Sequence, residues 1–335
     1  MKYAKYLFLI LGFALLARIA AQVEWQQVYT DLAKVGWRGF ALVLAMHVVT
    51  FWTDVAGWQL TFNSIPLSGL WNARLYAVRQ AGEAFNYILP AASVGGEPLK
   101  AALLKTHYRV AYREAAATQL LSRTINTIAL LIFVAIGFVF LVNSSDFPHS
   151  MKWLAAIGLG GVTIGTLFFV LMQWFKLSSV ISRRLSRTRF GRWLENVVHI
   201  VEEFDEHMVS FYRSNHARFA AALALGFINW VLGALEVYMV LGFIGFPIDF
   251  ADAWIIEALA QLMRAAAFLI PAAVGVQEGT FLVACRAITG IEATGVALSV
   301  VRRVRELLWV FIGLLLYWTY STHKPADANG YTSQT

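Results

Sequence analysis

Long apolar segments constrain the fold of this chain more than any other feature. A helix needs about 20 mostly apolar residues to cross a bilayer, and such helices satisfy their own backbone hydrogen bonds in lipid. Of the 335 residues, 59% are hydrophobic and 14% are charged, whereas soluble domains have about 25% charged residues. The candidate spans are residues 5–22, 39–62, 114–142, 151–175, 216–242 and 293–320. We therefore expect residues 1–335 to form one all-α, polytopic membrane domain.

Basic residues predict the orientation of the spans. Residues 100–113 and 176–192 are rich in Lys and Arg, as cytoplasmic loops are. Residues 143–150 and 245–252 contain acids but neither Lys nor Arg. We expect a multi-pass protein of the bacterial inner (cytoplasmic) membrane, with both termini inside and residues 5–22 as an uncleaved span. The net charge of +7 comes with no nucleic-acid-binding motif, so we expect no nucleic-acid partner.

Two further apolar segments, 76–104 and 253–285, are interrupted in the same way. In each, Pro-Ala-Ala is followed by glycine and then by a glutamate seven residues after the proline. Proline and glycine break helices, and broken backbone survives at membrane depth only when it is buried in protein or lines a wet cavity. We expect a re-entrant hairpin in each segment, although two crossings would preserve the same orientation. The expected break residues are Pro90, Gly95, Gly96, Pro271 and Gly275.

The two hairpins are predicted to have opposite orientations. The first would enter from the cytoplasm and the second from outside, which is typical of inverted-topology repeats in transporters. We expect repeat one at about 39–175 and repeat two at about 216–320. Between them, residues 180–212 have apolar side chains three and four apart. This pattern predicts a cytoplasmic amphipathic linker on the membrane surface, or alternatively a soluble helix packed on the protein.

Polar residues occupy matching positions in the two hairpins. Glu97 and Glu278 follow the breaks, where restarting helices would present free N–H groups that attract anions. A carboxylate at this depth needs a partner or a proton. Upstream, Glu83 and Arg264 both lie seven residues before their proline, so we expect that they could pair across the two hairpins.

Arginines after each hairpin complete the predicted site. Arg302 and Arg305 share one helix face, and the guanidinium fork suits phosphate; the alternative is that they reach the headgroup level. The expected substrate- or proton-binding residues are Glu97, Glu278, Arg302, Arg305, Arg123, Arg264, Glu83, Gln80, Gln261 and Gln277. His47 is interpreted as a core residue, and Glu236 as a plausible cavity residue.

Sequence patterns of catalytic sites are absent. There is no HExxH, G-x-S-x-G, Walker A or Cys/His metal spacing, and the single cysteine, Cys285, excludes an intramolecular disulfide. We therefore expect no enzymatic activity, no catalytic residues, no metal and no cofactor.

The motifs NYILPAASVGGEPLKAALL, PAAVGVQEG and ALSVVRRVRELLWVFIG together resemble the UPF0104 family, the flippase-like membrane part of lysylphosphatidylglycerol synthases. The similarity covers about residues 40–320 and is strongest to a stand-alone branch associated with hopanoid biosynthesis. It implies movement of a lipid or lipid-linked molecule between leaflets. The working residues it implies are Pro90, Gly95, Gly96, Glu97, Pro271, Gly275, Gln277, Glu278, Arg302 and Arg305.

No counterpart of the synthase domain of the two-part members occurs in residues 1–335, so we do not expect the aminoacyl-lipid substrate to carry over. We expect a lipid translocase for a headgroup that is anionic or bears phosphate, possible links being hopanoid or envelope lipid metabolism. Two alternatives stay open. One is a non-catalytic assembly partner of lipid-biosynthesis enzymes, and the other is a lipid-headgroup-modifying enzyme. Homo-oligomerisation and binding to such enzymes also stay open.

Overall fold

The computed structural model describes residues 25–88, 96–174, 215–267, 270 and 273–322. The expected span 5–22, the linker 180–212 and three predicted break residues, Pro90, Gly95 and Pro271, lie outside these ranges.

The regular elements in these ranges are helices, and no strand occurs in them. The helices are α2 (Trp25–Leu60), α3 (Gly69–Ile88), α4 (Glu97–Tyr108), α5 (Tyr112–Asn143), α6 (His149–Trp174), α9 (His216–Ile244), α10 (Phe250–Ala266), α11 (Val276–Thr289) and α12 (Glu292–Thr322). Among the described helices, α2, α5 and α9 are long and apolar enough to cross a membrane. The prediction of an all-α membrane protein is confirmed.

The predicted spans agree closely with observed helices. Residues 114–142, 216–242 and 293–320 correspond to α5, α9 and α12 within two residues at each end. The span 39–62 corresponds to the longer part of α2, which kinks at Gly36, where φ is +57°. A positive φ is a conformation that glycine adopts readily. Apolar content and helix-breaking residues therefore located the helix ends well.

Both interrupted segments are divided into two helices. The first gives α3 and α4, and the second gives α10 and α11. At the start of α4, a Cβ on Gly96 would lie 1.9 Å from the carbonyl oxygen of Gly82, so the two halves of the hairpin approach too closely for any other residue. At the start of α11, Gly275 has a φ of +80°. Glycine is needed at each restart, for a different reason in each case.

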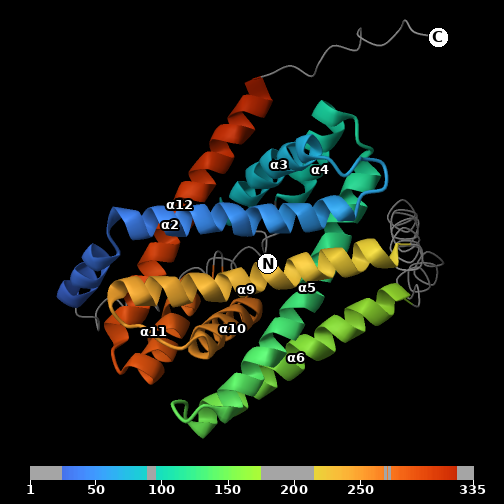
Figure 1. Cartoon of the computed structure of the whole chain (residues 1–335). Helices are drawn as coiled ribbons and strands as arrows, with labels where there is room; N and C mark the ends of the chain where they lie inside the picture. The colour runs from blue at the N-terminus through green and yellow to red at the C-terminus, as the bar shows by residue number, and fades with distance from the viewer. Residues whose placement is uncertain (1–24, 89–95, 175–214, 268–269, 271–272, 323–335) are drawn as a thin grey trace, which may run out of the picture.

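Eight of the nine described helices form two sets of four in the same order, α2–α5 and α9–α12, and α6 lies outside both sets. α2 and α9 run side by side (Figure 1). Each hairpin's first helix packs against the long last helix of the other set, α3 against α12 and α10 against α5. Within each set, the short α4 and α11 pack against α5 and α12 respectively. This reciprocal packing is what a twofold repeat requires, whereas the inverted orientation in the bilayer stays a prediction.

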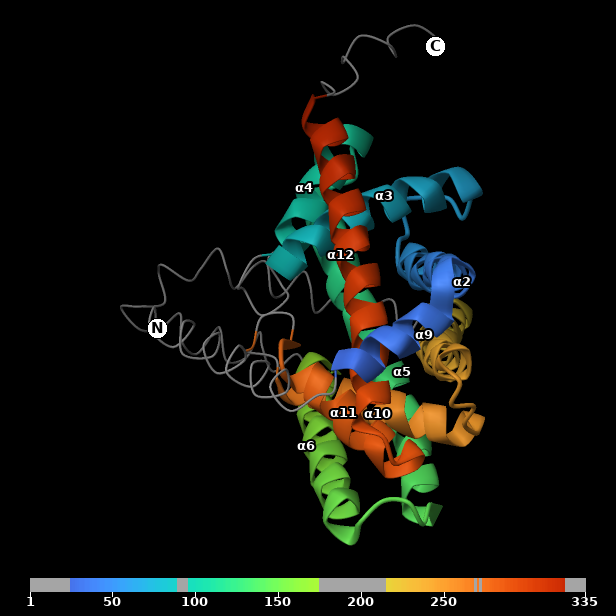
Figure 2. The same cartoon turned by 90° about the vertical axis from the view of Figure 1, so that its left-hand side faces the viewer.

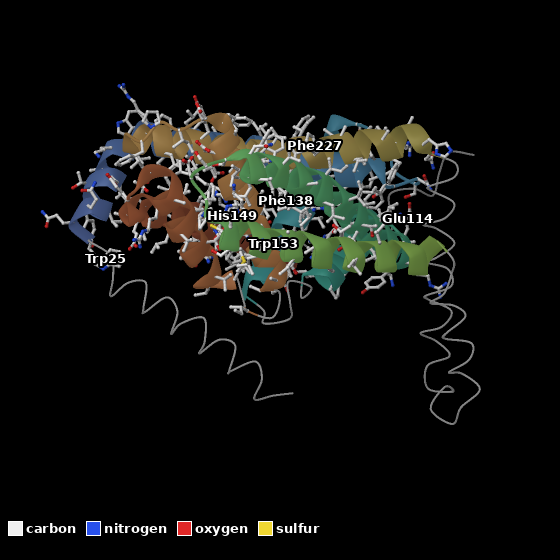
Figure 3. The ribbon with its side chains drawn as sticks, turned by 90° about the horizontal axis from the view of Figure 1, so that it is seen from below. Trp25, Glu114, Phe138, His149, Trp153 and Phe227 are labelled. Atoms are coloured by element: carbon white, nitrogen blue, oxygen red, sulfur yellow. The ribbon has the colours of Figure 1, made fainter. Side chains whose placement is uncertain are left out.

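The outer surface is apolar on several helices. α6 packs on α5 and α10, on the opposite side of the described part from α9 (Figures 2 and 3). Its Trp153 is 71% exposed, and Leu307 and Trp318 of α12 are 65% and 64% exposed. Large apolar side chains on the outside are unfavourable in water but suit a lipid environment.

Candidate functional site

A polar cavity of about 360 Å³ lies between the two sets of helices. Its walls come from α2, α3 and α5 of the first set and from α9, α10 and α12 of the second. Five acids and four arginines line it, namely Asp54, Glu83, Glu236, Glu257, Glu306, Arg79, Arg264, Arg302 and Arg305. So many ionisable groups inside a membrane protein are expensive, and they typically mark a site for substrate or ions.

One buried ion-pair cluster joins three helices of the second set. Arg302 of α12 is 3% exposed. Its Nη2 lies 2.6 Å from Glu257 Oε2 of α10, and its Nε lies 3.3 Å from Glu236 Oε1 of α9. Glu236 also forms an ion pair with Arg305. Arg302 further donates to the Gly233 carbonyl over 3.1 Å. Both arginines are thus compensated, as buried charges must be.

A second ion pair lines the first-set side of the cavity. Arg79 Nη2 of α3 lies 2.6 Å from Asp54 Oδ2 of α2. The amide of Asn126 on α5 donates to the other carboxylate oxygen over 3.3 Å. Asp54 and Glu236 therefore hold similar places, each an acid on the first helix of its set with an arginine partner.

Glu97 anchors the restart of the first hairpin. Its carboxylate accepts hydrogen bonds from Arg123 Nη2 of α5 at 2.6 Å and from Lys100 Nζ at 3.1 Å. Lys100 also lies 2.5 Å from Glu83 Oε1 of α3. The Gly96 N–H donates to Asn86 Oδ1 over 2.6 Å. The free N–H at this helix start is therefore satisfied by α3, and the charges join α3, α4 and α5.

Glu278 has the corresponding role in the second hairpin. Its carboxylate accepts a hydrogen bond from the Gly275 N–H at 2.8 Å, which caps α11, and one from Arg303 Nε of α12 at 2.6 Å. Arg303 also donates to Glu306 at 3.0 Å and to the hydroxyl of Tyr87 at 3.2 Å. Tyr87 belongs to α3, so this network crosses between the two sets, whereas the described contacts of Glu97 stay within the first set.

The structure brings six of the ten predicted binding residues to the cavity wall, and these are Gln80, Glu83, Gln261, Arg264, Arg302 and Arg305. The other four, Glu97, Arg123, Gln277 and Glu278, are not among its lining residues. Gln277 accepts a hydrogen bond from Arg264. Glu97 and Glu278 were expected to belong to the binding site, but they do not line this cavity. Helix capping and arginine pairing direct their carboxylates to the hairpin restarts instead.

The expected pair between Glu83 and Arg264 is wrong. Glu83 pairs with Lys100, while Arg264 Nη2 lies 3.5 Å from Glu306 Oε1. Both residues line the same cavity, but each has a closer partner of opposite charge on another helix.

Sequence reasoning missed Arg79 and Glu257, and it placed His47 in the core although it lines the cavity. One signal was present. His47 and Asp54 are seven residues apart, as are Asn229 and Glu236, and all four line the cavity from the equivalent helices α2 and α9. Alignment of these two polar pairs would have identified their four residues as parts of one site. Glu257 has no such counterpart, because Tyr76 occupies the corresponding stretch of α3.

Comparison with known proteins agrees with this architecture. A curated UPF0104 membrane protein of Methanothermobacter thermautotrophicus (strain Delta H) is 21% identical over 257 residues, which is 72% of this chain and 73% of that protein. No solved structure matches the chain. The model of the lysylphosphatidylglycerol synthase TM region family matches residues 5–314. The chain therefore belongs to the lysylphosphatidylglycerol synthase TM region family.

Proposed function

We propose that this membrane protein moves a lipid, or a lipid-linked molecule, between the leaflets of the bacterial inner membrane, without chemically changing it. The observation that carries the proposal is the polar cavity between the two helix sets, inside a chain whose outer surface is apolar. A headgroup that crosses a bilayer must exchange its water for polar protein groups, because polar groups left alone in hydrocarbon are costly. The acyl chains can stay in lipid meanwhile.

The two hairpins supply the moving parts in this proposal. A substrate site near the midplane, formed with broken helices, alternates in exposure when one repeat rocks against the other. The Glu97–Arg123 pair ties α4 to α5, and the Glu278–Arg303 pair ties α11 to α12. Each pair stabilises one hairpin in the described arrangement, so breaking and reforming them would accompany exposure to each leaflet.

Family membership supports a lipid-related role, since the family takes its name from the membrane region of lipid-modifying synthases. A link to hopanoid or envelope lipid metabolism is part of the proposal, as is a multi-pass topology with both termini in the cytoplasm. The arginines led to the expectation of an anionic or phosphate-bearing headgroup, but each arginine of the cavity wall lies beside a carboxylate.

The test is leaflet exchange of fluorescent lipids in proteoliposomes, read by bleaching the outer leaflet with an impermeant reductant. Wild type should move at least one lipid class faster than protein-free vesicles. Glu97→Gln and Glu278→Gln should each slow this movement about tenfold, the change that about 1.4 kcal/mol produces, while the variants remain folded.

Glu292→Gln is the matched control, because Glu292, the first residue of α12, pairs with the exposed Arg286 of α11 and does not line the cavity. Normal movement in both hairpin variants would refute the role of the glutamates. Absence of movement for every lipid, in folded protein, would refute translocation and favour an assembly role. Conversion of a labelled lipid to a new product would favour an enzyme.

A further inference from the structure

We infer that the cavity selects a lipid whose headgroup is uncharged and rich in hydroxyl groups, such as a sugar or another polyol, over an anionic phospholipid. The inference rests on the proposed function and specifies the substrate class of the same site. Three features of the wall lead to it: its charges are already paired, its polar atoms both donate and accept, and aromatic rings lie among them.

Each arginine of the wall already has a carboxylate partner. Arg79 lies 2.6 Å from Asp54, and Arg302 lies 2.6 Å from Glu257. Arg305 pairs with Glu236. A phosphate that took one of these arginines would leave a buried carboxylate without its cation, and an unpaired buried charge is strongly unfavourable.

The two remaining acids and the remaining arginine follow the same rule. Glu83 pairs with Lys100, which extends from α4. Arg264 has the most exposed side chain of the lining arginines that form ion pairs, at 41%, and it still has Glu306 and Gln277 as partners. Among the described residues, the wall therefore offers no arginine or lysine that an anionic headgroup could neutralise without disrupting an existing pair.

Hydrogen-bonding capacity remains on the wall after these pairs are formed. Among the described residues, Gln80 Oε1 and Asn126 Oδ1 are acceptors without a hydrogen-bond partner, and Arg79 Nε, Arg305 Nε and Trp309 Nε1 are donors without one. A hydroxyl group both donates and accepts, whereas phosphate oxygens only accept and an ammonium only donates. Polyols match a mixed wall of this kind, once the small side-chain rotations that uncover these buried atoms have occurred.

Aromatic residues complete the match. Phe51, Tyr87, Trp230 and Trp309 line the cavity beside the amides. Their rings combine an apolar body with, in Tyr and Trp, a polar edge. A sugar ring has a similar division, with C–H groups on its faces and hydroxyls around its rim. Rings and amides together can therefore hold an uncharged headgroup without any change in the ion pairs.

The first experiment compares three fluorescent lipids with identical acyl chains in wild-type proteoliposomes: a monoglucosyl diacylglycerol, phosphatidylethanolamine and phosphatidylglycerol. The glucosyl lipid should move about tenfold faster than phosphatidylglycerol, relative to protein-free vesicles. Movement of phosphatidylglycerol at an equal or higher rate would overturn the inference and leave translocation intact. Preference for phosphatidylethanolamine would also overturn it, in favour of a zwitterionic headgroup.

A binding measurement separates selectivity from transport. Short-chain versions of the glucosyl lipid and of phosphatidylglycerol are titrated into the detergent-solubilised full chain below their micellar concentrations, and the loss of tryptophan fluorescence is compared with that in Trp309→Phe. Saturable, glucosyl-selective quenching without leaflet movement would support the inference and refute translocation. Failure of the glucosyl lipid to bind more tightly would overturn the inference.

A charge variant tests the reason for the selectivity. Glu306→Gln removes the carboxylate beside Arg264, so it should raise the rate for phosphatidylglycerol relative to the glucosyl lipid about tenfold. Glu292→Gln neutralises an acid on the same helix outside the cavity, and it should leave the ratio unchanged. An unchanged ratio in folded Glu306→Gln would contradict the charge-balance argument. If this variant does not fold, the wild-type binding titration still decides the question.

Discussion

Neutralising Glu236 should destabilise this protein more than neutralising Glu257, although both carboxylates lie in the same buried cluster. Removing one partner of a buried ion pair typically costs about 3–5 kcal/mol, because the other charge stays buried without compensation. Glu257→Gln leaves Arg302 with Glu236 at 3.3 Å and with the Gly233 carbonyl at 3.1 Å. Glu236→Gln removes the carboxylate that serves Arg302 and Arg305 together.

We therefore expect a loss of about 2–3 kcal/mol for Glu257→Gln, at or below the lower end of the range for a broken buried pair, and about 4–5 kcal/mol for Glu236→Gln. The exposed pair of Glu292 with Arg286 gives a matched control, since exposed pairs contribute about 0–1 kcal/mol. Glutamine is nearly isosteric with glutamate, so the series changes charge with little change in volume.

The assay is equilibrium unfolding of the purified chain in mixed micelles, followed by tryptophan fluorescence and repeated at two salt concentrations. A higher salt concentration should change the loss of unfolding free energy more in the exposed control than in the buried variants, because buried charges are poorly screened. The reasoning would be refuted if Glu257→Gln cost as much as Glu236→Gln, or if both fell within 0.5 kcal/mol of the control (a difference of about 2.3-fold in the unfolding equilibrium).

Three further predictions test packing, reactivity and topology. Gly96→Ala should destabilise the fold by several times the roughly 1 kcal/mol that is average for a point mutation, because its Cβ would lie 1.9 Å from the Gly82 carbonyl oxygen. Gly160→Ala on α6 is the control: its Cβ would have no atom within 4 Å, so it should have the small effect of a surface change. Equal stability losses of the two variants in thermal unfolding would refute this reasoning. Cys285 is fully buried, so a maleimide should label it much more slowly in the native chain than after denaturation, and equal rates would place it at the surface. In a Cys285→Ala background, Ser145→Cys should react with an impermeant maleimide added outside intact cells, and labelling only after cell disruption would reverse the predicted orientation.

The sequence by itself determined where the helices lie and where they break. Apolar length set α5 and α9, because a backbone in lipid must satisfy its own hydrogen bonds and a helix does so locally. The Pro and Gly positions located both interruptions, and Glu97 and Glu278 were correctly placed at the helix restarts. These features depend on residues close together in the chain, so they can be inferred without knowledge of the tertiary packing.

Only the tertiary structure decided which charges meet. Glu278 pairs with Arg303, and Glu83 pairs with Lys100 instead of the expected Arg264. Spacing along a helix shows which residues share a face, but not which neighbour that face contacts, since contact depends on how each helix is rotated and crossed against the others. The pairing that leaves the cavity wall electrically balanced, and with it the inferred preference for an uncharged headgroup, therefore arises from helix packing between two halves of the chain that are distant in sequence.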